Sequence, residues 1–273
     1  MRTAVFTIKG GVGKTVLVLS IGLAAALVYN KKVLLVDTDL QADLSYRVLG
    51  DAISLYSVSS EENYGIARFA SIPNVEPKPI QIFENLHLIP MEYDAFMHVD
   101  QQTIMRKISG LPDDYDLVII DTPPSFDRNS AFELLNNVDA IFSVVAPAFS
   151  SIRIIGAELR LVIPMLVEKI RNTPYFIGII KNNLYATVSE SIQSAILSLN
   201  EICESDMKKI PHYYPCTFLN EVYRRGRIFN YDTFAHNIRT KNTKAIKTNL
   251  GIANVIKVTE EFLKRLEKGM KDK

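Results

Sequence analysis

The segment at residues 9–15 reads Lys9-Gly10-Gly11-Val12-Gly13-Lys14-Thr15. It follows the β-branched run Thr3–Ile8 and precedes an apolar run from Val16 to Val28, so a strand leads into it and a helix leads out of it. Glycines let the backbone wrap closely around a ligand with its N–H groups pointing inward, and the N-terminus of the following helix adds partial positive charge. The sequence therefore predicts a phosphate-binding loop at this position.

The polar side chains of this loop indicate which ligand it binds. Lys14 is expected to reach the β- and γ-phosphates of a nucleotide, and the Thr15 hydroxyl is expected to ligate Mg²⁺. We therefore predict ATP and Mg²⁺ as cofactors, and hydrolysis of ATP to ADP and phosphate as the reaction. The predicted nucleotide-binding residues of the loop are Gly10, Gly11, Val12, Gly13, Lys14, Thr15 and Val16.

Apolar runs alternate with helix-length segments along the rest of the chain. The apolar runs are continuous rather than interspersed with polar residues, which indicates strands that are buried on both faces of a mostly parallel sheet. We expect strands at Thr3–Ile8, Val33–Val36, Leu86–Ile89, Leu117–Ile120, Ile141–Val145 and Phe176–Ile180, and a weaker one at Tyr213–Thr217. Helices are expected at Lys14–Tyr29, Asp94–Ser109, Asn129–Asn136, Ser151–Arg171, Val188–Cys203 and Gly251–Lys268.

This alternation predicts an α/β chain with the three-layer P-loop NTPase fold, in which a mostly parallel twisted sheet has helices on both faces. Residues 51–85 are the least regular part and are expected to form a loop-rich excursion. No linker divides the chain, so residues 1–273 are expected to form a single ATPase domain. Because the phosphate loop begins at residue 9, no N-terminal helix-turn-helix domain is expected.

The composition is that of an ordinary soluble globular chain. Of the 273 residues, 48% are hydrophobic and 22% are charged, and the net charge is +1. The charge is unevenly distributed, because residues 1–140 hold 11 basic and 18 acidic side chains whereas residues 141–273 hold 20 and 12. The second half is therefore the part suited to meeting a polyanion.

Two further features bear on the cellular compartment. Cys203 and Cys216 form no C-x-x-C pair, which is typical of a reducing cytosol and argues against an iron–sulfur or zinc site. The run Val16–Val28 is similar to the apolar region of a signal peptide, but it is too short to span a bilayer. The phosphate loop explains this run better, as a buried helix.

Acidic side chains follow two of the predicted strands. Asp37 and Asp39 come directly after Val33–Val36, in a stretch that ends at Gln41, and Asp121 comes directly after Leu117–Ile120. A carboxylate at the end of a strand and close to the γ-phosphate can orient an attacking water, and a second one can hold Mg²⁺. The stretch after the second acid reads Thr122-Pro123-Pro124.

Together, the three motifs resemble the deviant Walker A family of P-loop ATPases, which includes ParA, Soj and MinD, and the similarity extends over nearly the whole chain. The resemblance implies that Lys9 reaches across a dimer to the partner's nucleotide, so that ATP clamps two subunits. It further implies that Asp39 positions the attacking water and that Asp121 holds Mg²⁺ together with Thr15. The implied catalytic residues are Lys9, Lys14 and Asp39, and the implied switch residues, in segments that move when the γ-phosphate leaves, are Asp37, Gln41, Thr122 and Pro123.

The chain also departs from the family pattern. Leu40 stands where a proline is usual in the first switch, and Val16 stands where many relatives carry a threonine that touches the α-phosphate. Gln41 favours ParA over MinD as the nearest type within the family. Two weaker similarities imply that Asn182 and Pro215 contact the base, with Asn183 as the alternative to Asn182.

A basic region near the end of the chain favours DNA as the partner. Residues 206–249 hold nine basic and three acidic side chains, a net charge of +6, and pairing of two subunits would double their phosphate contacts. We expect a ParA-like ATPase that dimerises on ATP, binds DNA non-specifically and drives plasmid or chromosome segregation by cycles of hydrolysis. The predicted DNA-binding residues are Arg224, Arg225, Arg227, Arg239, Lys241, Lys244 and Lys247.

The resemblance further implies a ParB-like centromere-binding adaptor that stimulates hydrolysis, and a cytoplasmic location on the nucleoid. One alternative is a MinD-like membrane-surface ATPase, because the tail around Phe262 and Leu266 resembles a basic amphipathic anchor. Both residues also continue the apolar face of the closing helix, so a membrane is not the expected surface. Another alternative is an ATP-dependent metabolic ligase of the same superfamily, for which the sequence carries no second-substrate motif.

Overall fold

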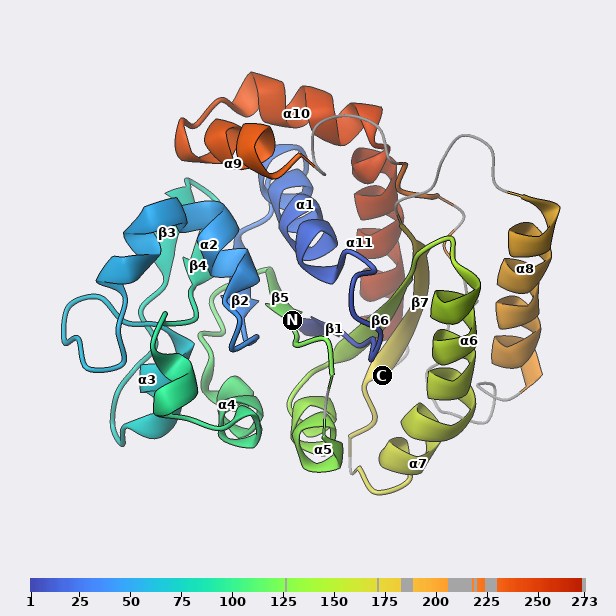
Figure 1. Ribbon diagram of the computed structural model, residues 1–273, viewed down its shortest axis with the longest axis horizontal. Helices are drawn as coiled ribbons and strands as arrows, with labels where there is room; N and C mark the ends of the chain where they lie inside the picture. The colour runs from blue at the N-terminus through green and yellow to red at the C-terminus, as the bar shows by residue number, and fades with distance from the viewer. Residues whose placement is uncertain are drawn as a thin grey trace.

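The computed structural model describes residues 1–125, 127–170, 172–182, 189–205, 218, 220–223 and 230–271. Within these residues, strands form one mostly parallel sheet, in which only the outermost pair is antiparallel (Figure 1). The α/β architecture predicted from the sequence is therefore confirmed. Across the sheet the strands lie in the order β3 (Ile80–Phe83), β4 (Leu86–Ile89), β2 (Val33–Asp37), β5 (Leu117–Asp121), β1 (Arg2–Val5), β6 (Ala140–Val145) and β7 (Tyr175–Lys181), with β3 antiparallel to β4.

Helices cover both faces of this sheet (Figure 1). One face carries α1 (Lys14–Leu27), α2 (Asp43–Leu49), α9 (Tyr231–Arg239), α10 (Thr243–Ile252) and α11 (Val255–Lys271). The other carries α3 (Ile66–Ser71), α4 (Gln101–Lys107), α5 (Arg128–Asn136), α6 (Phe149–Ala157) and α7 (Ile163–Val167), and α8 (Glu190–Ser205) packs against α6 from outside. Short 3-10 turns lie at Gly50–Leu55, Ala95–Met97 and Ile108–Gly110.

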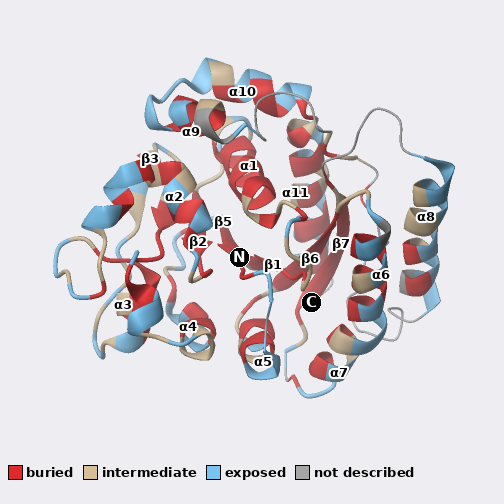
Figure 2. Ribbon diagram, in the orientation of Figure 1, coloured by how far each residue is buried: buried red, intermediate tan, exposed pale blue. Residues whose placement is uncertain are grey.

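The continuous apolar strands explain these layers. Every residue of β2, β5 and β6 is buried, because helices remove both faces of these strands from water. Helix α1 is buried from Val16 to Ala26, between the sheet on one side and α10 and α11 on the other. Figure 2 shows the buried residues along the strands and α1, with exposed residues on the outward sides of the peripheral helices. The start of α1 is therefore held at the centre of the molecule.

Several elements differ from those expected from the sequence. Residues 51–85 are not only a loop, because they include most of the turn Gly50–Leu55, all of α3 and the edge strand β3. The helix expected from Asp94 is α-helical only from Gln101, where the Asp100 carboxylate accepts the N–H of Thr103 at 2.8 Å and caps it. Helices α2, α9 and α10 were not predicted. The strand expected at Tyr213–Thr217 lies outside the described residues.

The long helix expected at Ser151–Arg171 is interrupted in its middle. A π-helical turn at Glu158–Val162 joins α6 to α7, just before Pro164. Proline lacks a backbone N–H, and its ring clashes with the carbonyl four residues earlier, which accounts for the local change of helical pitch. Glu158 is 1% exposed, and its Oε2 accepts the backbone N–H of Ile8 at 3.2 Å. A buried carboxylate of this layer thus contacts the entrance to the phosphate loop.

Candidate nucleotide site

The phosphate loop lies between the end of β1 and the start of α1, with a backbone conformation that favours glycine. Gly11 has φ +76° and Gly13 has φ +85°, both in the left-handed region. Gly13 is the N-cap of α1 and offers no side-chain cap, which leaves the first N–H groups of the helix to an anion. A Cβ at Gly10 would lie 3.4 Å from the Cβ of Pro124, so the loop also lies against the segment after β5.

Lys14 folds back over its own loop. Its Nζ donates to the carbonyl oxygens of Thr7 at 3.2 Å and Lys9 at 3.4 Å. Burial lowers the pKa of Lys14, and the charges of Asp121, Glu158 and Asp39 oppose that shift. The ammonium is therefore kept beside three carboxylates at the mouth of the loop.

The first acidic stretch is tied together by its own hydrogen bonds. Asp37 is fully buried, and its Oδ2 accepts the N–H of Ser45 at 2.8 Å and the Ser45 hydroxyl at 2.6 Å. Burial raises the pKa of Asp37 to about 7. Asp39 Oδ1 accepts the N–H of Gln41 at 3.0 Å, and burial raises the pKa of Asp39 as well, with the charge of Asp43 adding to the effect. Asp37 thus positions α2, whereas Asp39 faces the phosphate loop.

The ends of β2 and β5 are joined directly. The Thr38 hydroxyl donates to the carbonyl oxygen of Asp121 at 2.6 Å, and the Thr38 N–H donates to the same oxygen at 3.0 Å. Thr122 donates its hydroxyl to the carbonyl oxygen of Val5 in β1 at 2.6 Å. The two predicted switch segments are therefore linked to each other and to the strand that carries the phosphate loop.

Asp121 has the properties of a magnesium ligand. Both of its carboxylate oxygens are buried and accept no hydrogen bond from the described part of the chain. Burial and the nearby Asp37 raise the pKa of Asp121 well above its ordinary value, while the neighbouring Thr15 hydroxyl and Lys14 oppose the shift. A divalent cation between Asp121 and Thr15 would favour the ionised carboxylate, and Mg²⁺ commonly needs only one or two protein groups beside phosphate and water. The residues present therefore fit Mg²⁺.

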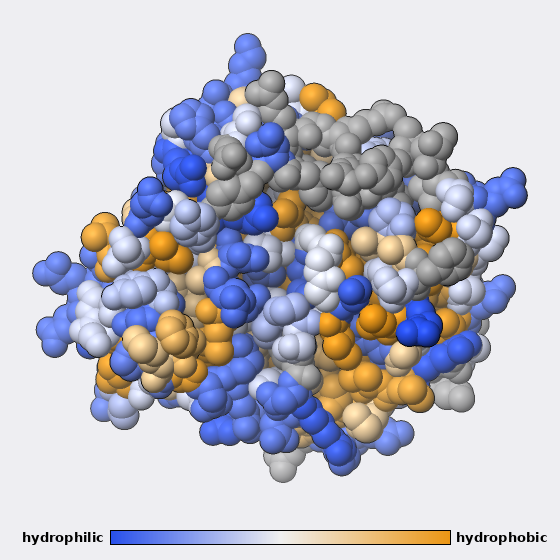
Figure 3. Space-filling model, in the orientation of Figure 1, coloured by the Kyte–Doolittle hydropathy of each residue, from blue (hydrophilic) through white to orange (hydrophobic). Residues whose placement is uncertain are grey.

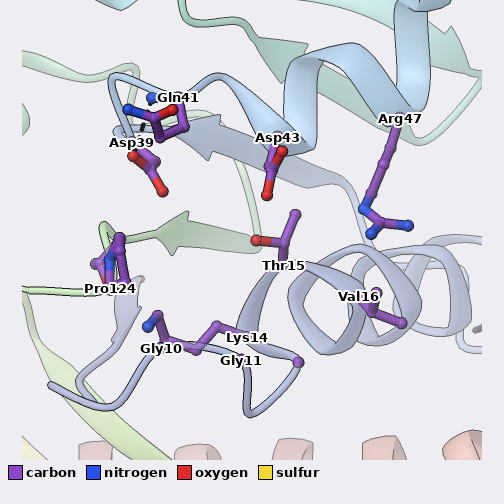
Figure 4. A pocket seen from close by; sticks show the side chains of 12 residues that line it. Gly10, Gly11, Lys14, Thr15, Val16, Asp39, Gln41, Asp43, Arg47 and Pro124 are labelled. Carbon is purple, nitrogen blue, oxygen red and sulfur yellow. Dashed lines mark hydrogen bonds between the residues drawn. The ribbon is translucent and has the colours of Figure 1, made fainter.

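A cavity of about 500 Å³ lies over the phosphate loop. It has the size of a small-molecule site. Figure 4 shows its labelled side chains from Pro124, Asp39 and Gln41 at one end, past Thr15 and Asp43, to Arg47 and Val16 at the other. The lining residues are Gly10, Gly11, Gly13, Lys14, Thr15, Val16, Asp39, Gln41, Asp43, Arg47, Thr122 and Pro124.

The structure brings most of the predicted site residues together, but some lie elsewhere. Lys9, Val12, Asp37, Asp121 and Pro123 do not line the cavity, although the loop and strand ends that carry them surround it. Asn182 follows the last residue of β7, and its side-chain amide donates to the carbonyl oxygen of Val12 at 2.8 Å. It therefore helps to hold the phosphate loop in place. Its Oδ1 is buried and accepts no hydrogen bond within the described residues. Pro215 and Asn183 lie outside the described residues.

Three lining residues were not predicted from the sequence. Asp43 and Arg47 are one turn apart on α2, and Pro124 is the second proline of its pair. The signal for Asp43 and Arg47 was present in their spacing, because residues four apart share a helix face, and this helix directly follows the Asp37–Gln41 stretch. The signal for Pro124 was weaker, because nothing in the sequence separates it from Pro123.

The predicted DNA-binding residues are only partly described. Arg239, Lys244 and Lys247 are exposed on α9 and α10, and the surface over these helices is largely hydrophilic apart from the grey atoms (Figure 3). A second hollow of about 570 Å³ there is lined by Asn237, Asn242, Lys244, Ala245, Thr248, Asn249 and Ile252. Lys241 donates from Nζ to the carbonyl oxygen of Ile82 and lies 4.7 Å from the ring centre of Phe83. Arg224, Arg225 and Arg227 lie outside the described residues.

Two properties of the described helices bear on whether they could anchor the chain to a membrane. In the part of the chain that the structure describes, no helix is both long and apolar enough to cross a membrane. Phe262 and Leu266, which could have formed the apolar face of an amphipathic anchor, are buried in the core at 0% and 2% exposure.

Comparison with known protein families gives a match over the first half of the chain. A family model described as an AAA domain matches residues 2–154. A virulence plasmid ParA family protein, pGP5-D of Chlamydia psittaci, is 33% identical over 136 residues, which are 46% of this chain and 49% of that protein. The chain thus spans about half the length of this relative. The chromosome-partitioning ATPase Soj of Treponema pallidum is 30% identical over 198 residues, which are 69% of this chain and 73% of that protein.

Solved structures share the fold over almost the whole chain. The structure of pNOB8 ParA superposes with a TM-score of 0.70 at 19% identity, covering 98% of both chains. The same protein bound to nonspecific DNA gives a TM-score of 0.63 at 18% identity, again covering 98% of both chains. Cobyrinic acid a,c-diamide synthase from Mycobacterium smegmatis, with bound ADP and magnesium, gives 0.63 at 23% identity, covering 87% of this chain and 93% of that one.

Proposed function

Because the chain belongs to the ParA/Soj/MinD family of deviant Walker A P-loop ATPases, we propose that it is a ParA-like ATPase that moves DNA. In this proposal it binds Mg²⁺ and ATP, dimerises around the nucleotide, binds DNA without sequence preference and releases it on hydrolysis. The observation that carries the proposal is the cavity in which the phosphate loop, Asp39 and Thr122 converge beside the buried Asp121. Residues 1–273 would act as one domain, since the described strands share one sheet.

Binding of the triphosphate would use the loop backbone and Lys14. The uncapped start of α1 supplies N–H groups, and Lys14 would exchange its contacts with the Thr7 and Lys9 carbonyls for the β- and γ-phosphates. Thr15 and Asp121 would hold Mg²⁺, which neutralises charge on the phosphate oxygens. The fit of Asp121 to this role rests on its two buried carboxylate oxygens without hydrogen-bond donors in the described chain.

Hydrolysis would depend on Asp39. Its carboxylate faces the cavity near Lys14 and Pro124, at the end where the γ-phosphate would lie (Figure 4). There it can orient the attacking water, while the N–H of Gln41 fixes its position. Loss of the γ-phosphate would release both switches together, because Thr38 joins the ends of β2 and β5.

Lys9 is proposed to act on the partner's nucleotide. It stands at the rim of the loop, and it does not line the cavity of its own subunit. Its side chain is therefore proposed to reach the nucleotide of a second copy that faces the cavity. The position of Lys9 outside the cavity of its own subunit supports the ATP-dependent homodimer of this proposal.

DNA would bind on the helices α9 and α10. Arg239, Lys244 and Lys247 are exposed there, and arginine and lysine side chains are typical donors to backbone phosphate. Contacts to phosphate alone carry no sequence information, which agrees with non-specific binding. A ParB-like adaptor that stimulates hydrolysis and a place on the nucleoid complete this proposal.

The decisive experiment measures DNA binding by the Asp39→Ala variant with ATP, with ADP and without nucleotide. The variant should bind ATP, hydrolyse it slowly and accumulate as a dimer on a random-sequence duplex, whereas ADP should support neither dimer nor DNA binding. The wild-type chain run in parallel serves as the control. DNA binding that is equal in all three nucleotide states would contradict the proposed coupling.

A second assay, which measures vesicle pelleting and ATP turnover, distinguishes this function from two alternatives. A MinD-like positioning ATPase would pellet with anionic vesicles in ATP rather than shift DNA, although the burial of Phe262 and Leu266 takes these two side chains of α11 away from such a role. A metabolic ligase would consume ATP only with a second small substrate. ATP turnover that rises with DNA and is unaffected by vesicles would favour the segregation ATPase.

A further inference from the structure

The end of the cavity farthest from Asp39 holds a cation that the phosphate-loop motif does not account for. Arg47 projects from α2 toward the first turn of α1, where Val16 lies (Figure 4). We propose that Arg47 is a nucleotide-positioning residue that binds the α-phosphate, so that the side-chain contact at this end of the triphosphate comes from α2 rather than from α1. This inference rests on the proposed function, because it assigns a role within the same nucleotide site.

The direction of the triphosphate in the cavity follows from the residues at its two ends. Lys14 is suited to the β- and γ-phosphates, and Asp39 is suited to the water that attacks the γ-phosphate. Both line the cavity, and Asp39 lies at the end marked by Pro124 and Gln41 (Figure 4). The chain of phosphates therefore runs from Asp39 toward Val16, and the α-phosphate falls at the end where Arg47 is.

Val16 gives this end of the cavity no hydrogen-bond donor from its side chain. It is 8% exposed and lines the cavity with a hydrocarbon side chain, so α1 offers only backbone N–H groups here. A guanidinium presents several N–H donors in a planar fork that matches phosphate oxygens. Among the described residues that line this end, Arg47 is the one with such donors.

Helix α2 is held firmly enough to position an arginine. Leu44 and Val48 are buried against α1, which turns Asp43 and Arg47 toward the cavity. Ser45 ties the helix to the buried Asp37, and the Ser45 hydroxyl also accepts the N–H of Met91 at 2.8 Å. The position of Arg47 is thus linked to the first switch at the end of β2.

The charges around the cavity also favour a cation at this place. Within the described part of the chain, the ionisable side chains that line it are the cations Lys14 and Arg47 and the acids Asp39 and Asp43. Lys14 lies among the carboxylates near the mouth of the loop, so without Arg47 the acids would outnumber the cations in a site for a polyanion. An ordinary pair between Asp43 and Arg47 along the helix is compatible with this role, because arginine has donors for both groups.

The test is calorimetric titration of the full chain in Mg²⁺ with three ligands: ADP, the slowly hydrolysed analogue ATPγS, and inorganic tripolyphosphate. Arg47→Ala should weaken binding of all three by a similar factor of about tenfold or more, the value expected for losing a hydrogen bond to a charged group. The affinities of Arg47→Lys should lie between those of wild type and Arg47→Ala, because lysine keeps the charge and lacks the planar set of guanidinium donors. Tyr46→Ala is the matched control, since Tyr46 is an exposed neighbour on α2 that does not line the cavity.

Selective effects would overturn the proposal. A loss confined to ATPγS would place Arg47 at the γ-phosphate or the dimer contact, and a loss confined to the two nucleotides would place it at the ribose or base. Equal affinities of Arg47→Ala and wild type for all ligands would also overturn it, while leaving the proposed function intact. A wild-type chain that binds neither ADP nor ATPγS would instead overturn the proposed function together with this inference.

A double-mutant cycle adds an independent check. A threonine hydroxyl at residue 16 can donate to the same phosphate, so Val16→Thr should restore part of the ADP affinity of Arg47→Ala, by about threefold or more. In the wild-type background the same substitution should gain less, because Arg47 already serves that phosphate. An identical gain in both backgrounds would show that the two positions act independently, and would contradict a shared α-phosphate.

Discussion

Lys14 lies beside the carboxylates of the site and donates to the loop carbonyls of Thr7 and Lys9. Replacing it with alanine would remove the cation beside Asp39 and the donor for the β- and γ-phosphates. We expect Lys14→Ala to weaken ADP binding by roughly a hundredfold or more in calorimetric titration. Lys9→Ala is the matched control from the same loop, and it should keep ADP binding but lose the ATP-dependent dimer. Wild-type ADP affinity in Lys14→Ala would contradict the proposed site.

Glu158 makes the stability of the nucleotide-free chain depend on pH. Burial raises the pKa of its carboxyl from 4.5 to about 8, so the folded chain keeps this proton between these values while the unfolded chain has lost it. The free energy of unfolding should therefore fall as pH rises from about 5 to 8, by at most about 1.4 kcal/mol per pH unit for this group, and then level off.

Urea unfolding of wild type and Glu158→Gln across this pH range tests whether Glu158 causes this pH dependence of stability. The advantage of the wild-type chain over Glu158→Gln should shrink as the pH approaches 8, because glutamine does not titrate. A difference that stays constant from pH 5 to 8 would show that Glu158 is already ionised in the folded chain. Asp37 titrates in the same direction in both proteins, so the comparison removes its contribution.

Helix α3 depends on a close approach between its first residues and the segment after β4. Glu92 is fully buried, and its carboxylate accepts the N–H groups of Gly65, Ala67 and Arg68 at 2.7–2.9 Å, which caps the helix. A Cβ at Gly65 would lie 1.8 Å from the carbonyl oxygen of Pro90. The two segments can therefore pack only with glycine at this position.

Gly65→Ala should accordingly destabilise the chain by about 3 kcal/mol, because backbone must move to admit the methyl group. Gly251→Ala on α10 is the matched control, since its Cβ would meet only Ile256 Cδ1 at 3.7 Å. A helical glycine replaced without a clash should raise stability by about 0.5–1 kcal/mol. Thermal or urea unfolding would measure both, and equal stabilities of the two variants would contradict the packing at Gly65.

Elements with a strong local pattern were predictable, and elements defined by capping were not. The strands β2, β4 and β5 matched within one residue because each is mainly apolar, although β4 includes His87. Helices α9 and α10 are capped by Asn230 and Asn242, whose side chains accept N–H groups three residues later. No continuous apolar run in the sequence marks where these two helices lie. Helix α2 was missed because its seven residues are too few to show a clear period.

The residues of the nucleotide site likewise divide into those that a sequence motif predicts and those that only the folded structure places in the site. The phosphate loop, Asp39 and Thr122 carry recognisable motifs, and the structure brings Asp39, Thr122 and all of residues 9–15 except Lys9 and Val12 to one cavity. Asp43, Arg47 and Pro124 join them only because α2 folds back over α1 and the loop after β5 lies against Gly10. Contacts of this kind depend on the meeting of separate segments, and a single sequence does not specify them.

Across the whole molecule, the exposed cations of α10 lie apart from the nucleotide cavity, so DNA binding and nucleotide binding should be separable. We expect Lys244→Glu with Lys247→Glu to weaken binding to a random-sequence duplex. The slope of log K against log salt should fall by about one for each DNA phosphate that is no longer neutralised by a lysine. ADP affinity should be unchanged. Fluorescence anisotropy at several salt concentrations measures the slope.

Lys169→Glu is the control for this prediction, because Lys169 is an exposed lysine near the end of α7 on the opposite layer. It should leave both affinity and salt slope near the wild-type values. If the Lys169 variant loses as much DNA affinity as the α10 variants, the DNA-binding surface is not confined to α9 and α10. An unchanged slope in the α10 variants would likewise exclude these lysines from the interface.

The edge strands of the sheet, β3 and β7, make contacts that bear on how copies of this protein could assemble. The pairing of β3 with β4 is short and shifts register between Gln81 and Phe83. The Nζ of Lys241 donates a hydrogen bond to the carbonyl oxygen of Ile82 in β3. At β7 the N–H groups of Phe218 and Val222 already bond to the carbonyls of Ile179 and Lys181. Both edge strands of the described sheet therefore carry contacts that disfavour pairing with a strand of a neighbouring copy. This arrangement favours helices and loops, rather than strand edges, as the surfaces through which copies of the chain would meet.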